Sequence, residues 1–346
     1  MMANPIDLEL LAHIEFGLLH ARVQTELSDW MKKSNSVSIL VCGKTGTGKS
    51  TLVNGLVGKL VAQEGEELDP MSSEVTNYDC KIGNIQLVIW DSPGLLDRTS
   101  REESYLADIK THCRDVDLFL YCILMSEDRF HSGSDDVESM KKLTQTLGNE
   151  LWANAIIVLT FAQDIEVEAK VQIDGPSDPQ KTREYFERKL KTWARDIHDI
   201  LVDEIKVPKD ITDQVSVLPA GYRTKLSLPD RHHWLSELWL ASLRAMKPRA
   251  QPAMIQINAH RFAEGCVTAD EGKKFLHEQS ILFKKKGAEI GLNHSIEGFL
   301  SGKRIIVGPE LGQKFGALVA DRVSIETILL LLIGSLNGIV PDVQPS

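Results

Sequence analysis

The sequence has few of the features that mark secreted, zinc-binding or nucleic-acid-binding proteins. Its five cysteines are odd in number and widely spaced, without a CxxC pair, which argues against a disulfide framework and a zinc site. The net charge of −10 argues against sequence-independent binding of nucleic acid. The first residues lack the basic start and uninterrupted apolar core of a signal peptide. We therefore expect reduced thiols in a cytoplasmic protein.

Long apolar runs are also absent. An ordinary membrane-spanning helix needs about 20 apolar residues. The most apolar stretch, 328–340, has 13 residues, and charged residues precede it. Runs of this length are more often buried helices, so we expect a helix in the core of a small C-terminal bundle. Attachment to a membrane surface and a buried contact with a partner are the alternatives.

Strand-like and helix-like segments alternate between residues 34 and 247, which predicts an α/β fold with a mostly parallel sheet. The pattern predicts strands at 37–42, 116–125, 155–159 and 215–218 and helices at 51–60, 101–113, 135–147, 181–204 and 234–246. Two more strands, 78–82 and 85–90, flank Gly83-Asn84, a tight-hairpin signal that adds one antiparallel edge strand. Residues 164–180 are expected to form an acidic loop.

Helical extensions are expected at both ends of this domain. Residues 6–33 place apolar side chains mostly three and four positions apart, as in an amphipathic helix. Such a helix packs on its own domain or forms a dimer contact. Pro248 and Pro252 mark a second boundary, beyond which a long helix is expected over 268–299. The predicted domains are therefore 1–33, 34–247 and 248–346.

The most specific motif is a glycine-rich loop between the first predicted strand and the first predicted helix of the domain. Residues 43–50 match the phosphate-binding pattern GxxxxGK[ST]. Its glycines let backbone N–H groups surround a phosphate, and the helix adds its positive end. Lys49 is expected to reach the β- and γ-phosphates, and Ser50 to ligate Mg²⁺. The predicted nucleotide contacts here are Gly43, Thr45, Gly46, Thr47, Gly48, Lys49, Ser50 and Thr51.

A second motif, Asp-Ser-Pro-Gly at 91–94, follows the hairpin. Asp91 there can hold a water of the Mg²⁺ shell, and the Gly94 N–H can bond a γ-phosphate. The polar segment before the hairpin offers another Mg²⁺ ligand. Ser72, Ser73 and Thr76 compete for this role, and Thr76 is preferred because it stands next to the strand. The predicted metal ligands are Ser50, Thr76 and Asp91.

Base recognition is expected after the strand 155–159, where GTPases usually carry [NT]KxD. The Asp of that motif selects guanine over adenine through two hydrogen bonds. Here Gln163, with a single acceptor oxygen, stands in the Asp slot, and Asp164 comes one residue late. The stretch 218–222 also follows a strand and is available to supply a backbone N–H to the base. The predicted base contacts are Thr160, Gln163, Asp164, Ala220 and Gly221, with Tyr222 near the ring.

Leu95 follows Gly94, where many small GTPases place a Gln that orients the attacking water. Because an apolar side chain cannot orient water, we expect slow intrinsic hydrolysis with help from a partner, a second copy or another residue. No catalytic residue is assigned. A nucleotide-binding interaction protein without hydrolysis is one alternative. An ATP-using P-loop enzyme is another, although the sequence has no ABC signature and no lid-like cluster of arginines.

Together these residues resemble the AIG-type GTPases, which include immunity-associated GTPases of animals and GTPases of the chloroplast outer-envelope translocon. Residues 43–50 and 91–94 match the first and third G-boxes. Arg129-Phe130 is similar to the Arg-Phe-Thr box of the animal members, with His131 in place of Thr. Residues 155–163 are close to the translocon members. The resemblance covers about residues 35–245.

The resemblance implies a three-layer P-loop GTPase fold that binds GTP and GDP with Mg²⁺ and hydrolyses GTP slowly. Members often pair through the nucleotide face, so a homodimer or oligomer is expected. The expected function is a nucleotide-dependent dimerising switch or scaffold. Many members sit on membranes through C-terminal segments, and 328–340 is the candidate here. A cytoplasmic location, with or without membrane association, is therefore expected.

Overall fold

The computed structural model describes residues 25–27, 29–62, 75–92, 94, 102–113, 115–125, 130–172, 178–263, 269–293, 296–297 and 304–305. The chain divides into two compact units. Residues 35–254 form one unit, and residues 1–34 together with 255–346 form the other. The limits of the three predicted domains stay a prediction.

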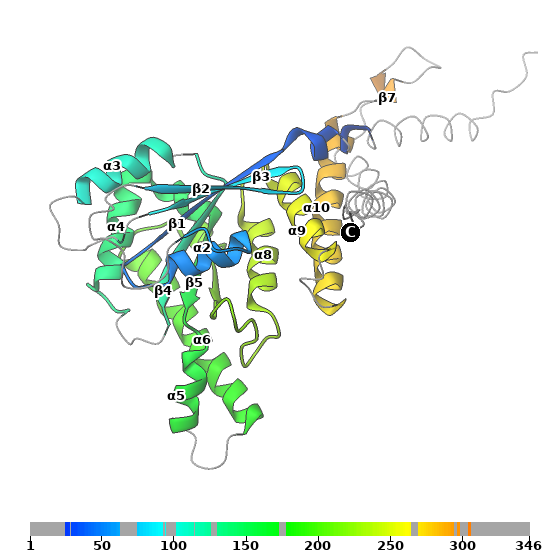
Figure 1. Cartoon of the computed structure of the whole chain (residues 1–346). Helices are drawn as coiled ribbons and strands as arrows, with labels where there is room; N and C mark the ends of the chain where they lie inside the picture. Colours follow the sequence, from blue (N-terminus) through cyan, green and yellow to red (C-terminus); the bar gives the residue numbers. More distant parts are fainter. Residues whose placement is uncertain are drawn as a thin grey trace, which may run out of the picture. The chain divides into compact units, whose positions relative to one another are not determined.

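A six-stranded sheet lies at the centre of the unit 35–254, in the order β2-β3-β1-β4-β5-β6 (Figure 1). The strands are β1 (Ser36–Gly43), β2 (Thr76–Ile82), β3 (Ile85–Asp91), β4 (Leu118–Leu124), β5 (Ala155–Thr160) and β6 (Ser216–Pro219). β2 runs antiparallel to β3, and all other neighbouring strands are parallel. The prediction of a mostly parallel sheet with one antiparallel edge strand is confirmed.

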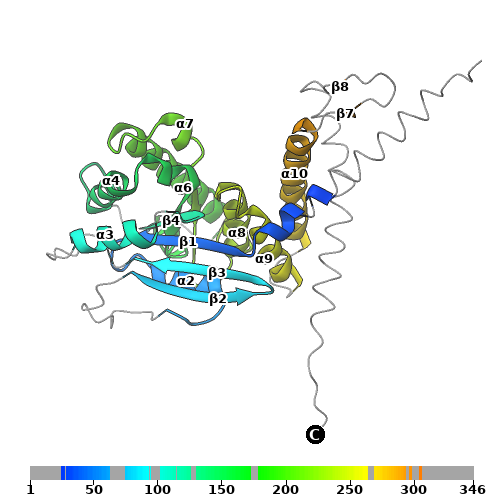
Figure 2. The same ribbon diagram turned by 90° about the horizontal axis from the view of Figure 1, so that it is seen from above.

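Helices connect the strands and cover both faces of the sheet. They are α2 (Lys49–Val57), α3 (Glu102–His112), α4 (Asp135–Leu147), α5 (Asp164–Gln172), α6 (Pro179–Asp203), α7 (Lys209–Thr212), α8 (Trp234–Ala245) and the 3-10 helix η1 (Asn149–Asn154). Figure 2 shows α2 on one side of β1 and α4 and α6 on the other. On the α4 side, the buried Tyr121 of β4 donates its hydroxyl hydrogen to the Asp136 carbonyl. The three-layer α/β fold is therefore as expected.

Two helices lie where the sequence suggested a loop or a boundary. The first is α5, which occupies the start of the expected acidic loop 164–180. Carboxylates in the first turn of a helix interact favourably with its dipole, so Asp164 and Glu166 mark a helix start. The second is α9 (Gln251–Ala263), which begins one residue before Pro252. Proline is tolerated in the first turn of a helix, so Pro252 lies at the start of a helix.

The other unit contains packed helices from both ends of the chain. Residues 25–27 and 29–33 are helical, and α10 (Ala269–Asn293) corresponds to the long helix expected over 268–299. The rings of Trp30 and Phe283 meet edge to face with centroids 5.8 Å apart. Gln256 of α9 donates a side-chain hydrogen bond to the Met31 carbonyl at 3.0 Å. The described N-terminal helix therefore packs against helices from beyond the sheet domain.

A short antiparallel pair, β7 (Ile296–Glu297) with β8 (Arg304–Ile305), follows α10. Among the described residues, no helix is both long enough and apolar enough to span a membrane. The apolar stretch 328–340 and most of the helix expected over 6–33 lie outside the described residues.

Candidate functional site

The predicted phosphate-binding loop joins β1 to α2. Gly46 and Gly48 have φ angles of 81° and 73°, in the left-handed region that favours glycine. This conformation turns the chain sharply into the first residue of α2, Lys49. Thr45 and Gly46 are exposed. The loop therefore places backbone N–H groups at a helix N-terminus, where an anion binds favourably.

The side chain of Lys49 lies inside this loop. The residue is only 8% exposed, and its Nζ donates to the Lys44 carbonyl at 2.8 Å. Thr47 donates its hydroxyl hydrogen to the same carbonyl, also at 2.8 Å. The cation is thus held next to the place where the loop would take a phosphate.

Ser50, at the start of α2, lies next to Asp91, at the end of β3. The Ser50 hydroxyl donates to Asp91 Oδ2 at 3.4 Å. Asp91 is 9% exposed, and its Oδ1 accepts no hydrogen bond from any described residue. Burial raises the pKa of Asp91 to about 6, against the lowering effects of Lys49 and Ser50. A buried carboxylate with one unpaired oxygen, beside a hydroxyl group, fits the oxygen ligands that Mg²⁺ prefers.

Thr76 stands directly opposite Asp91 in the antiparallel pair of β2 and β3. Residues opposite each other in such a pair project from the same face of the sheet. The fold therefore places Thr76 on the face that carries Asp91. The strand β2 begins at Thr76, two residues earlier than the sequence predicted. The competing candidates, Ser72 and Ser73, lie outside the described residues.

Gly94 lies against the phosphate-binding loop. A methyl group added to its Cα would be 1.7 Å from Thr45 Oγ1 and 2.7 Å from the Thr45 backbone nitrogen. The segment after β3 therefore reaches the exposed part of the loop, as the predicted γ-phosphate contact requires. Leu95 lies outside the described residues.

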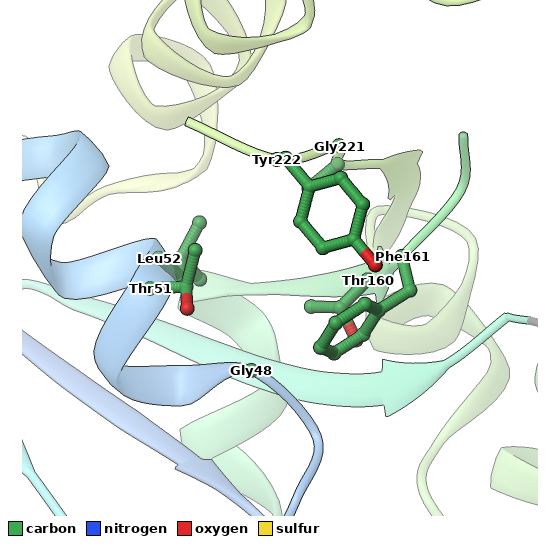
Figure 3. Close-up of a pocket in the computed structure, with 8 residues that line it drawn as sticks. Gly48, Thr51, Leu52, Thr160, Phe161, Gly221 and Tyr222 are labelled. Carbon is green, nitrogen blue, oxygen red and sulfur yellow. The ribbon is translucent and has the colours of Figure 1, made fainter. Parts of the chain in front are cut away.

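A pocket of about 250 Å³, including its open mouth, lies beside the loop. Figure 3 shows Thr51 and Leu52 of α2 on one side of it and the rings of Phe161 and Tyr222 on the other. The two rings meet edge to face with centroids 5.4 Å apart. The residues that line the pocket are Gly48, Thr51, Leu52, Thr160, Phe161, Ala220, Gly221 and Tyr222.

Five predicted nucleotide contacts line this pocket, which are Gly48, Thr51, Thr160, Ala220 and Gly221. Sequence reasoning missed Phe161, whose ring lies so close to Gly48 that a methyl group added there would be 2.9 Å from it. The signal was its position. Phe161 occupies the slot of the Lys in [NT]KxD, directly after Thr160.

Gln163 and Asp164 are not among the residues that line the pocket. Gln163 is 6% exposed, and its Oε1 accepts a hydrogen bond from the Tyr222 backbone N–H at 3.0 Å. Its Nε2 donates to Asp164 Oδ1 at 3.2 Å. The acceptor oxygen of Gln163 is thus engaged within the protein. A base contact from either residue stays a prediction.

Comparison with known proteins finds a family match over part of the chain. Residues 37–174 match the AIG1 family. The chain is 33% identical to Translocase of chloroplast 33, chloroplastic, of Arabidopsis thaliana over 138 residues, which is 38% of this chain and 44% of that protein. It is 28% identical to GTP-binding protein A of Dictyostelium discoideum over 140 residues, 38% of this chain and 29% of that protein. The chain thus matches less than half the length of these relatives.

A solved structure of the chloroplast translocon components atToc33 and psToc159 shares this fold. Its description says that dimerization is important for the GTPase activity of these components. The structure covers 66% of this chain and 92% of that chain, with a TM-score of 0.51 and 23% identity. Toc33 from Arabidopsis thaliana in complex with GDP and Mg²⁺ covers 70% and 95%, with a TM-score of 0.48 and 23% identity. The resemblance to the AIG-type GTPases is confirmed over residues 37–174, the segment that the AIG1 family model matches.

Proposed function

We propose that this chain binds GTP and GDP with Mg²⁺ and hydrolyses GTP slowly. The observation that carries the proposal is the buried Asp91, whose unpaired Oδ1 lies beside Ser50 at the foot of the phosphate-binding loop. A loop of this kind takes the phosphates on its backbone N–H groups. Guanine as the base is supported by the names of relatives, a GTP-binding protein and translocon components with GTPase activity.

The residues of the chain have distinct roles in this proposal. Ser50 and Thr76 would hold Mg²⁺ by their hydroxyl groups, and Asp91 would hold it directly or through water. When bound, the ion neutralises charge on the phosphates. Lys49 would turn from the Lys44 carbonyl to the β- and γ-phosphates. The Gly94 amide would bond the γ-phosphate.

We further propose that nucleotide loading drives pairing of two copies through the nucleotide face, which makes the protein a dimerising switch or scaffold. The relatives atToc33 and psToc159 support this, because dimerization is important for their GTPase activity. The apolar Leu95 supports it as well, since the chain lacks the usual water-orienting Gln at this position. The same residue favours the alternative, a protein that binds nucleotide and never hydrolyses it.

The location is also a proposal. We expect the nucleotide-binding domain to face the cytoplasm, with a membrane surface as a partner of the apolar stretch 328–340. One relative is named a chloroplastic translocase, and that location is a property of the relative.

Calorimetry on the purified chain tests nucleotide binding. With Mg²⁺ present, GTP and GDP are expected to bind, and ATP is expected to bind at least about tenfold more weakly. Lys49→Ala should abolish binding without loss of fold, because the hydrogen bond that it removes, to the Lys44 carbonyl, lies within the phosphate-binding loop rather than in the core. Lys59→Ala, an exposed lysine just beyond the end of α2, is the matched control. A lack of GTP and GDP binding, or a preference for ATP, would overturn the proposal.

Hydrolysis and pairing need a separate experiment. Single-turnover phosphate release, measured over a range of protein concentrations, should be slow and should accelerate as the GTP-loaded chain self-associates. Release that is undetectable at every concentration would leave the non-hydrolysing binder as the function.

A further inference from the structure

We propose that Gln163 is a positioning residue of the base site and does not itself read the base. This inference rests on the proposed function. The side chain of Gln163 links the loop after β5 to the loop after β6, which are 59 positions apart at the bonded residues. It thereby sets the place of the backbone amide that would meet the base.

The contacts of Gln163 engage both ends of its side-chain amide within the protein. Its only acceptor oxygen takes the hydrogen bond of the Tyr222 N–H at 3.0 Å, and its amide group donates to Asp164 at 3.2 Å. At 6% exposure, the side chain is packed in this arrangement. Because Gln163 does not line the pocket, Oε1 would have to turn away from the Tyr222 N–H to reach a base there, and the Tyr222 amide would lose its partner.

Gly221 lies between two anchored residues. On one side, the Ala220 carbonyl accepts from the Ala162 N–H at 3.0 Å, and the Ala220 N–H donates to the Leu159 carbonyl at 2.8 Å. On the other side, Tyr222 is held by Gln163. The position of Gly221 is therefore fixed by the backbone hydrogen bonds of Ala220 and by the hydrogen bond from Tyr222 to the Gln163 side chain.

Gly221 is also closely packed against Gln163. A methyl group added to Gly221 would lie 3.2 Å from both Gln163 Oε1 and Trp234 Nε1. Gly221 lines the pocket, and its own N–H makes no hydrogen bond with any described residue. The amide is thus held at the pocket with its donor available. The Gly221 N–H is thus a suitable hydrogen-bond donor to the 6-oxo group of guanine, a group that adenine lacks.

Hydrogen exchange on the nucleotide-free protein tests the positioning directly. Gln163→Met keeps the length of the side chain and removes both hydrogen bonds, so exchange of the 220–224 amides should accelerate about tenfold. Gln163→Glu keeps an acceptor for the Tyr222 N–H but puts a second carboxylate beside Asp164, so it is compared in an Asp164→Asn background, where exchange should stay close to that of the unmodified protein. Gln145→Met, on the exposed face of α4, is the control. If Gln163→Met leaves exchange at 220–224 unchanged, the proposal fails, whether or not the protein binds nucleotide.

Binding of GDP, IDP and XDP separates positioning from reading. All three carry the 6-oxo group, but IDP lacks the 2-amino group and XDP has oxygen there. A positioning role predicts that Gln163→Met weakens all three by a similar factor, about three- to tenfold, as expected for one hydrogen bond. If Gln163 reads the base, Gln163→Met should lose affinity selectively for GDP. Gln163→Glu should then prefer GDP over XDP more strongly than the unmodified protein does. Either of these results would overturn the proposal. If the unmodified chain binds none of the three, the proposed function fails, while the exchange experiment still decides the role of Gln163.

Discussion

Gly94 approaches Thr45 so closely that a methyl group added to Gly94 would lie 1.7 Å from Thr45 Oγ1. A carbon atom cannot come so near an oxygen without a bond, so any larger residue at position 94 must displace the segment after β3 or the phosphate-binding loop. Close packing transmits such shifts to neighbouring groups. The contact therefore couples the expected γ-phosphate donor to the loop that would hold the other phosphates.

Gly94→Ala is expected to separate the two nucleotide states. GDP binding should stay within about threefold of the unmodified protein, because the segment after β3, which is expected to contact only the γ-phosphate, should give way to the added methyl group rather than the phosphate-binding loop. GTP hydrolysis should fall by at least about tenfold, as for the loss of one transition-state donor. Calorimetry and single-turnover phosphate release measure the two effects.

The double variant Thr45→Ala/Gly94→Ala is the control for this prediction. Removing the Thr45 hydroxyl takes away the nearest clash, so part of the hydrolysis rate should return, with a measurable coupling between the two sites. Strictly additive effects of the two substitutions would show that the contact does not cause the loss.

Ser50→Ala should weaken nucleotide binding only when Mg²⁺ is present. The hydroxyl is expected to ligate the ion, so GDP affinity with Mg²⁺ should fall about tenfold or more, and GDP affinity in a chelator should be unchanged. Ser36→Ala, an exposed serine at the start of β1, is the matched control. An equal loss with and without Mg²⁺ would show that Ser50 supports the loop rather than the ion.

Tyr222→Ala is expected to weaken GDP binding about tenfold, because stacking of a base on an aromatic ring is worth about 1–3 kcal/mol. Tyr222→Phe keeps the ring and should bind nearly as well as the unmodified protein. Tyr222 is 39% exposed, so loss of its ring should not unfold the protein. Fluorescence titration with a labelled GDP gives both affinities. Normal binding by Tyr222→Ala would place the base elsewhere.

The sheet and the phosphate-binding loop were predictable because they depend on local patterns. Val41 and Leu120 belong to apolar runs that are buried on both faces, which is typical of central parallel strands. The glycines of 43–50 stand at positions where the backbone adopts φ angles that favour glycine. No knowledge of distant residues was needed for either prediction.

The base site was less predictable because its geometry depends on contacts between distant segments. Gln163 occupies the slot of a base-reading residue, yet its side chain bonds to Tyr222, which no local pattern foretells. Phe161 becomes a wall of the pocket only because Gly48 and Tyr222 pack against it. The start of α5 at Asp164 was missed because acidic residues occur both in loops and in first turns of helices.

An ion-pair cluster joins the segment after α8 to the turn before β4. Arg249 Nε donates to Asp117 Oδ1 at 2.7 Å, and Lys247 donates to Asp115 Oδ1 at 2.6 Å. Arg249 also donates to the other carboxylate oxygen of Asp115. The hydrogen bonds from Lys247 and Arg249 lower the pKa of Asp115 from 3.8 to about 2.

Asp115→Asn should therefore destabilise the protein in a pH-dependent way. A carboxylate whose pKa is lower in the folded state stabilises that state above its unfolded pKa, and this contribution is lost as the pH falls from about 4 to about 2. Because the Asp115 side chain is 69% exposed, solvent screens the pairs, and the loss at pH 7 should be below about 1 kcal/mol. Urea unfolding at pH 7 should show this difference, and 1 M salt should reduce it. At pH 2 the variant and the unmodified protein should be nearly equal in stability. A difference that persists unchanged at pH 2 would mean that packing, rather than charge, makes Asp115 stabilising.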